Sequence, residues 1–136
     1  MTKIIRQSVR FAATPAQLFE MYIDSAKHTA ATGGKAKLSR KAGGTFTAWN
    51  KMLCGRNLMI VPNRMVVQSW RSVNFRPRDR DSILVLEFNK APGGAQLDLV
   101  HVNVPMQDHA GVKNGWPKYY WQPWKRYLAE RSKRRR

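Results

Sequence analysis

One histidine of this chain, His101, has a sequence environment that could support chemistry. It follows Leu97 and Leu99 at intervals of two, and alternate residues of a β-strand point to the same face of a sheet. A strand over residues 96–104 would therefore place the imidazole on a buried, apolar face. A neutral imidazole there could orient a ligand or move a proton; the alternative is a structural histidine satisfied by a backbone partner. Asp98 has the opposite parity, so no His-Asp pair is expected within this strand.

The other reactive or metal-binding side chains do not form a recognised site. Asp24 and His28 are four residues apart and could share a helix face, but two ligands do not define a metal site. The string Gly33-Gly34-Lys35 lacks the flanking residues of a phosphate-binding loop. Cys54 is the only cysteine, which excludes an internal disulfide, and it carries no signature of a nucleophile. We therefore predict no catalytic residue, no metal and no cofactor.

The most unusual feature of the composition is its positive charge, since 25 Lys and Arg face 8 Asp and Glu for a net +17. Such a surface attracts polyanions, including nucleic acids. Two basic clusters could contact phosphates, one in the loop over residues 71–80 and one in a basic tail over about residues 129–136. Their members are Arg76, Arg78, Arg80, Arg131, Lys133, Arg134, Arg135 and Arg136. No nucleic-acid-binding motif is found, so this hypothesis predicts only weak, sequence-independent binding; the alternative for the tail is a solvated helix end.

Hydrophobic periodicity predicts an α+β domain. Residues 5–11 alternate as in a strand with one buried face, and Thr14 followed by Pro15 indicates the start of a helix over residues 16–22. A second short helix should end near Thr32, where two glycines follow. The apolar runs after residue 37 are short and are separated by turn residues, which predicts an antiparallel meander. The expected strands cover residues 45–49, 52–61, 65–71, 82–89 and 96–104.

The segment after Pro105 is expected to form a long C-terminal helix whose regular part begins at Pro117. Six aromatic residues fall between positions 116 and 127, several of them at helical spacing, which indicates a buried aromatic face. Pro123 lies inside this helix and should bend it, because proline lacks the N–H that would bond to the carbonyl of Tyr119.

Length and composition favour one domain over residues 1–136. Apolar residues make up 43% of the chain, which is enough to form a core. No apolar run approaches the roughly 20 residues of a membrane-spanning helix, and the N-terminus lacks the apolar stretch of a secretory signal. We therefore expect a cytoplasmic protein without a membrane span.

Short motifs spread along nearly the whole chain carry a family resemblance. They comprise residues 15–19, 32–34, Gly43-Gly44 with Phe46 and Trp49, 55–57, 62–64, 67–71, 97–105, Gly115-Trp116 and 119–121. Together they resemble the bacterial proteins similar to the C-terminal domain of the activator of the heat-shock protein 90 ATPase. These belong to the SRPBCC superfamily, with lipid-transfer (START), polyketide-cyclase and birch-pollen-allergen (Bet v) domains. The resemblance implies a helix-grip fold: a curved antiparallel sheet around a long C-terminal helix, with two short helices after the first strand.

The resemblance also implies a hollow between the sheet and the C-terminal helix, in which a small apolar or amphipathic ligand could bind. Strand parity and the aromatic stripe then indicate the residues that would line it; the alternative is that they simply fill a core. They are Phe19, Trp49, Trp70, Leu84, Leu86, Phe88, Leu97, Leu99, His101, Tyr120, Trp121 and Trp124. An uncovered aromatic patch could support a homodimer, and the family's namesake suggests an interaction with a chaperone by analogy alone.

Overall fold

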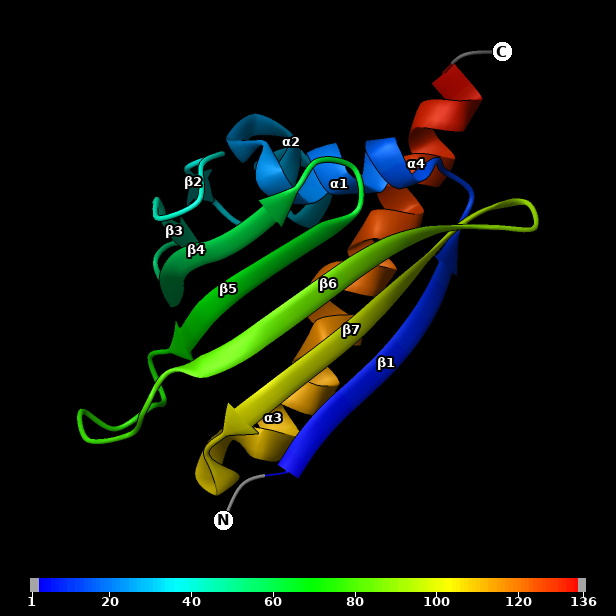
Figure 1. The fold of residues 1–136 in the computed structure, drawn as a ribbon. Helices are drawn as coiled ribbons and strands as arrows, with labels where there is room; N and C mark the ends of the chain where they lie inside the picture. Colours follow the sequence, from blue (N-terminus) through cyan, green and yellow to red (C-terminus); the bar gives the residue numbers. More distant parts are fainter. Residues whose placement is uncertain (1–2, 135–136) are drawn as a thin grey trace.

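A computed structural model describes residues 3–134, which form a curved antiparallel sheet with a long C-terminal helix lying across it (Figure 1). This confirms the predicted α+β helix-grip fold. The elements in chain order are β1 (Lys3–Phe11), α1 (Pro15–Ile23), α2 (Ser25–Thr32), β2 (Lys37–Leu38), β3 (Thr45–Ala48), β4 (Leu53–Val61), β5 (Met65–Ser72), β6 (Ser82–Ala91), β7 (Gly94–Val104), α3 (Met106–Trp116), η1 (Pro117–Trp121) and α4 (Gln122–Arg134).

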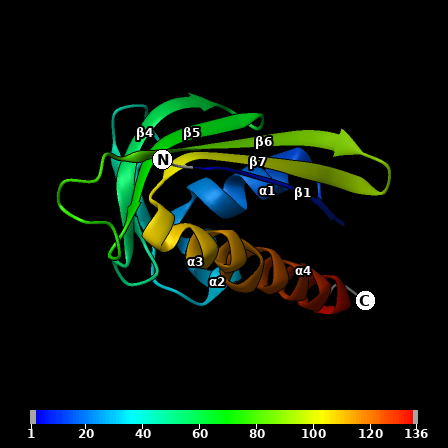
Figure 2. The same ribbon diagram turned by 90° about the horizontal axis from the view of Figure 1, so that it is seen from below.

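The seven strands follow the order β1-β7-β6-β5-β4-β3-β2, so a meander from β2 to β7 is closed at one edge by β1. Every neighbouring pair is antiparallel. The C-terminal helix crosses one face of this sheet (Figure 2), while α1 packs against β6 and β7 and α2 contacts α4 and β2. The helices thus cover the apolar face and leave the other face to solvent.

The two short helices begin and end where the sequence predicts. The Thr14 hydroxyl accepts a hydrogen bond from the Gln17 N–H at 3.1 Å, and the Gln17 side chain accepts one from the Thr14 N–H at 2.7 Å. This reciprocal capping box fixes the start of α1, with Pro15 in its first turn. Helix α2 ends at Gly33, whose φ of 88° is a left-handed conformation that glycine adopts without steric cost.

The C-terminal helix occupies the segment after Pro105 as predicted, but its regular part begins at Met106 rather than Pro117. It runs through α3, a π-helical turn η1 and α4. Pro117 has no N–H, so the Lys113 carbonyl lacks its usual partner one turn later; that carbonyl accepts a hydrogen bond from the Gln7 side chain of β1 at 2.9 Å. A π-helical turn lies immediately before Pro123, where the Gln122 N–H bonds to the Pro117 carbonyl. The bend predicted at Pro123 stays a prediction.

The core lies between the sheet and the helices, and its strand parity is as predicted. Leu84, Leu86 and Phe88 on β6 are buried, as are Leu97 and Leu99 on β7. The short strand β2 was not predicted, because its two residues are too few to show a period. Within residues 3–134, no helix is both long enough and apolar enough to span a membrane.

Candidate functional site

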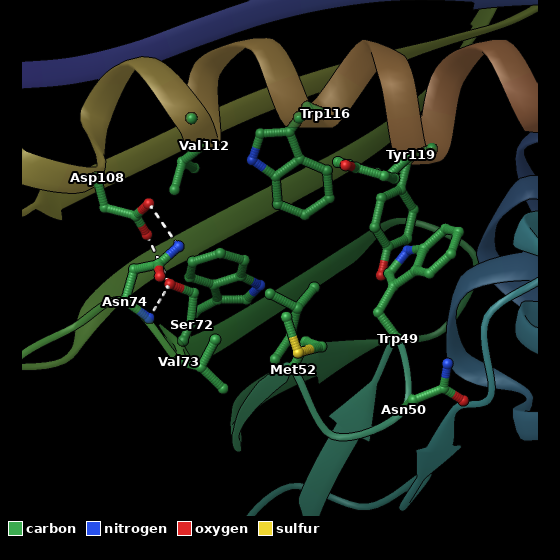
Figure 3. Close-up of a pocket in the computed structure, with 15 residues that line it drawn as sticks. Trp49, Asn50, Met52, Ser72, Val73, Asn74, Asp108, Val112, Trp116 and Tyr119 are labelled. Carbon is green, nitrogen blue, oxygen red and sulfur yellow. Dashed lines mark hydrogen bonds between the residues drawn. The ribbon is translucent and has the colours of Figure 1, made fainter.

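A pocket of about 410 Å³ opens between the C-terminal helix and the end of the sheet where β4 begins and β5 ends (Figure 3). Helix α3 and the turn η1 form one wall, and the β3–β4 turn forms the opposite wall. Its volume falls within the range of small-molecule sites. The lining residues are Trp49, Asn50, Met52, Leu53, Trp70, Ser72, Val73, Asn74, Asp108, Gly111, Val112, Gly115, Trp116, Tyr119 and Tyr120.

The β3–β4 turn holds Trp49 at the pocket by an unusual backbone. Trp49, Asn50 and Lys51 all have left-handed φ values, of 49°, 57° and 72°. The turn is tied down because the Asn50 N–H donates to the Lys35 carbonyl at 3.0 Å. Behind the indole lies Gly34, where a Cβ atom would come within 2.3 Å of the Trp49 ring. Gly34 is therefore the residue that makes room for this wall of the pocket.

The helical wall combines large aromatic rings with two glycines. Trp116 lies with its ring centroid 6.0 Å from that of Trp70, which belongs to the sheet side. Gly111 and Gly115 are four residues apart and so share a helix face. Because neither carries a side chain, the space beside Trp116 stays open. Tyr119 closes the pocket toward Trp49, with its ring centroid 5.2 Å from that indole in an edge-on arrangement.

The one ionisable carboxyl group in this lining belongs to Asp108, which is only 6% exposed. The Ser72 hydroxyl donates to Asp108 Oδ2 at 2.6 Å, and the Asn74 amide donates to Oδ1 at 3.3 Å (Figure 3). Asp108 also lies in the first turn of α3, where the helix dipole favours a negative charge. Within residues 3–134, none of the ion pairs includes Asp108.

His101 lies in the core beside the pocket, and both its ring nitrogens are hydrogen-bonded. The Trp116 indole donates to Nδ1 at 3.2 Å, and Nε2 lies 2.8 Å from the Ser82 hydroxyl, which donates to the Trp70 carbonyl at 2.6 Å. Ser82 must therefore accept from Nε2–H, which fixes the tautomer. Burial lowers the pKa of His101 to about 3. The geometry favours the structural alternative, since this imidazole holds Trp116 in place.

The second buried histidine, His28, positions another pocket residue. Its Nδ1 lies 2.7 Å from the Tyr22 carbonyl and must donate to it, so Nε2 accepts from the Tyr120 hydroxyl at 2.9 Å. Burial lowers the pKa of His28 to about 4 and raises that of Tyr120 above its usual value.

Asp24, which the sequence placed on the same helix face as His28, has other partners. Its side chain accepts a hydrogen bond from the Lys27 N–H and lies 3.7 Å from Arg40. In the described part of the chain, no group of three metal-binding side chains exists.

The structure divides the residues that the sequence assigned to one cavity. Trp49, Trp70 and Tyr120 line the pocket, whereas Phe88 contacts a second hollow near the start of α1. The remaining residues are at most 3% exposed and belong to the filled core, so the open space lies nearer the beginning of the C-terminal helix than the prediction placed it. They are Phe19, Leu84, Leu86, Leu97, Leu99, His101, Trp121 and Trp124.

Most of the residues that line the pocket were not identified from the sequence, because many of them belong to turns and to the first turns of α3. Asp108 looks in the sequence like an ordinary acidic residue near a helix start, and Asn50 and Asn74 look like turn residues. One signal was present: Gly111 and Gly115 at a spacing of four indicate a helix face without side chains. That signal could be used only once the helix was known to begin at Met106.

The two basic clusters lie at opposite ends of the molecule. The β5–β6 loop extends from one end of the sheet, and α4 ends at the other (Figures 1 and 2). The side chains of Arg76, Arg78, Arg80, Arg131 and Lys133 are exposed, whereas the side chain of Arg134 and all of Arg135 and Arg136 lie outside the described part of the chain. A single compact polyanion site formed from both clusters is therefore not supported.

Comparison with known proteins identifies relatives along most of the chain. The family model described as Activator of Hsp90 ATPase homolog 1-like protein matches residues 12–129. The mouse Activator of 90 kDa heat shock protein ATPase homolog 2 is 26% identical over 112 residues, which are 82% of this chain and 34% of the mouse protein. This chain thus spans about a third of the length of the curated relatives it matches.

Solved structures show the same fold. A crystal structure described as an HSP90 activator from Plasmodium falciparum superimposes with a TM-score of 0.80 at 22% identity, covering 95% of this chain and 96% of that one. The Aha1 dimer from Colwellia psychrerythraea gives a TM-score of 0.73 at 11% identity, covering 86% and 90%. With the match of the family model to residues 12–129, these findings show that the chain belongs to the family of Activator of Hsp90 ATPase homolog 1-like proteins.

Proposed function

We propose that this protein binds a small apolar or amphipathic molecule in the pocket between α3, η1 and the β3–β4 turn. The observation that carries the proposal is an open volume of about 410 Å³ with mostly apolar walls and a few hydrogen-bonding groups at one side. This combination is typical of small-molecule sites. The pocket lies between the sheet and the C-terminal helix, although nearer the beginning of that helix than the sequence prediction placed the hollow.

The packing behind the pocket supports a preformed site. His101 accepts a hydrogen bond from the Trp116 indole, and His28 accepts one from the Tyr120 hydroxyl. The Trp49 ring packs against Gly34, which has no side chain. Walls that are held by buried hydrogen bonds and close packing lose little conformational entropy when a ligand binds. The pocket therefore does not need to be assembled by its ligand.

A variant that fills the pocket tests this function. At Gly115 a Cβ atom would meet only the Tyr119 ring, at 3.5 Å, so Gly115→Leu should add its side chain to the open space without disturbing the core. We expect native mass spectrometry with a lipid and polyketide panel to detect a bound ligand that Gly115→Leu weakens by at least about tenfold. Ser132→Leu adds the same side chain on exposed α4 and should bind normally. A panel in which nothing binds the wild-type protein would refute the proposal.

Family membership favours a second candidate, the regulation of a chaperone ATPase. The names of the mouse and Plasmodium relatives describe activators of heat-shock protein 90. This chain covers about a third of the mouse protein and 96% of the Plasmodium chain, so the activity must be measured on this chain itself. The test is the ATP hydrolysis rate of an Hsp90 chaperone with and without this protein, with an unrelated protein of similar positive charge as the control. An unchanged rate would remove this candidate.

A further inference from the structure

The lining of the pocket combines many aromatic rings with a single carboxylate. Five aromatic side chains face it, and the negative face of an aromatic ring attracts cations. They are Trp49, Trp70, Trp116, Tyr119 and Tyr120. Tyr119 already attracts one cation of the protein itself, because the Lys118 ammonium lies 5.2 Å from its ring centroid. A pocket lined by several aromatic rings and one carboxylate is chemically suited to an ammonium group.

The charge of the lining is opposite to that of the whole protein. The chain carries 25 Lys and Arg and a net charge of +17. Among the described residues that line the pocket, however, there is no Lys, Arg or His, and Asp108 is the one charged side chain. The pocket is therefore a local negative, aromatic region in a positively charged molecule.

Asp108 has hydrogen-bonding capacity left for a ligand. A carboxylate offers about four acceptor positions. Ser72 occupies one position on Oδ2 and Asn74 one on Oδ1, and both donors are neutral. Arg71, the basic residue of β5, is half-buried and is paired with Asp81 at 3.1 Å instead. A buried carboxylate without an ion-pair partner in residues 3–134 can be stabilised by a cationic ligand.

From this geometry we propose that the ligand of the pocket is an organic cation: an amine or quaternary ammonium group on an apolar body, with its charge beside Asp108. The inference rests on the proposed small-molecule function and specifies its ligand class. The ammonium contacts the carboxylate and the rings of Trp70 and Trp116, while the apolar body extends toward Trp49 and Tyr119. Neutral or anionic molecules with the same body lack both attractions.

Three probes that share one body separate charge from apolar contact: phenylpropylamine, phenylpropanol and phenylbutyrate. Binding is followed by NMR through the indole N–H signals, of which Trp49, Trp70 and Trp116 report on the pocket and Trp121 and Trp124 on the core. We expect the amine to bind at least about tenfold more tightly than the alcohol or the acid. Because the net charge of +17 attracts the anion, a preference for the amine must arise in the pocket.

A matched pair of variants tests the role of the carboxylate. Asp108→Asn keeps an acceptor for Ser72 and removes the charge, so it should weaken amine binding about tenfold and phenylpropanol binding much less. Glu130→Gln removes an exposed carboxylate of α4 outside the pocket and should change neither. If Asp108→Asn fails to fold, the selectivity of the wild-type protein among the three probes decides the question.

The outcomes distinguish this inference from the function on which it rests. Equal or tighter binding of phenylpropanol or phenylbutyrate would overturn the cation inference, as would unchanged amine affinity in Asp108→Asn. If phenylpropanol binds as tightly as the amine and Gly115→Leu prevents it, the small-molecule function stands while the cation inference fails. If none of the probes shifts the pocket indole signals, the cation inference fails, and the lipid and polyketide panel decides the small-molecule function.

Discussion

At the scale of single residues, the two buried histidines act as structural links rather than as reactive groups. Each bridges an aromatic side chain of the pocket to another part of the core: His101 connects Trp116 to Ser82, and His28 connects Tyr120 to the Tyr22 carbonyl. Both geometries require a neutral ring, because one nitrogen must donate and the other must accept. Their protonation would therefore break the contacts that position the pocket walls.

This requirement predicts that stability falls in mild acid. The pKa of His28 is about 4 and that of His101 about 3 in the folded protein, against 6.5 without the fold. Below pH 6.5 the unfolded chain thus binds more protons than the folded one, and the free energy of unfolding decreases as pH falls toward these values. Each histidine contributes a slope of at most about 1.4 kcal/mol per pH unit.

Urea unfolding between pH 7 and about pH 4 measures this slope. In His28→Gln and His101→Gln the slope should be shallower than in the wild-type protein, although both variants start from a lower stability at pH 7. The titration of exposed carboxylates is common to all three proteins and cancels in the comparison. Parallel curves for the wild type and both variants would contradict the assignment of these histidines as neutral in the fold.

At the scale of elements, the fold was more predictable from the sequence than the pocket. Strand parity placed Leu84, Leu86 and Leu97 correctly in the core, because a one-residue error would have put every alternate side chain in solvent. The start of the regular part of the C-terminal helix was misplaced, because residues 106–115 contain two glycines and few apolar residues and therefore show no clear helical period.

The pocket depends on features that no local pattern reveals. It exists where two turns and a glycine-containing helix face leave space, and that space is a property of the assembled elements. Left-handed backbone at Trp49 and Lys51, on either side of Asn50, is unusual for these two residue types, so propensity could not indicate it. The paired glycines before this turn could be recognised as a helix end, whereas the contact of Gly34 with the Trp49 ring required coordinates.

These adjacent glycines give an element-scale prediction, because they are needed for different reasons. Gly33→Ala places a side chain at φ 88° in open space and should cost roughly 1–2 kcal/mol of stability without moving Trp49. Gly34→Ala drives a Cβ atom into the Trp49 ring and should cost about 1–3 kcal/mol while displacing that ring from the pocket wall. Urea unfolding gives the stabilities, and the Trp49 indole N–H signal reports the displacement.

The test of this prediction is to compare ligand binding and the Trp49 signal between Gly33→Ala and Gly34→Ala. Phenylpropanol binding should weaken in Gly34→Ala and persist in Gly33→Ala, provided that both remain folded at the temperature of the measurement. A Trp49 signal that moves equally in both variants would show that the helix end, rather than the Gly34 contact, positions the indole.

At the scale of the whole molecule, the pocket and the basic surface are separate features. The pocket lies on the side of the C-terminal helix that faces the sheet, whereas the exposed cations of residues 131–133 project from its far end. The arginines of the β5–β6 loop lie at the opposite end of the molecule. Any polyanion contact through the tail should therefore leave ligand binding in the pocket unaffected, and the two clusters should act independently.

Deletion of residues 131–136 tests the polyanion hypothesis for the tail. It removes five cations, so if all of them contact duplex DNA the magnitude of the slope of the logarithm of affinity against the logarithm of salt should fall by roughly 4.5. Replacing Arg76, Arg78 and Arg80 with alanine should lower the slope by a separate amount, and the combined variant should show the sum. Arg6→Ala on β1 is a control for net charge. Absence of DNA binding by the wild-type protein at low salt would eliminate this hypothesis, whereas a slope unchanged by the deletion would assign the binding to other cations.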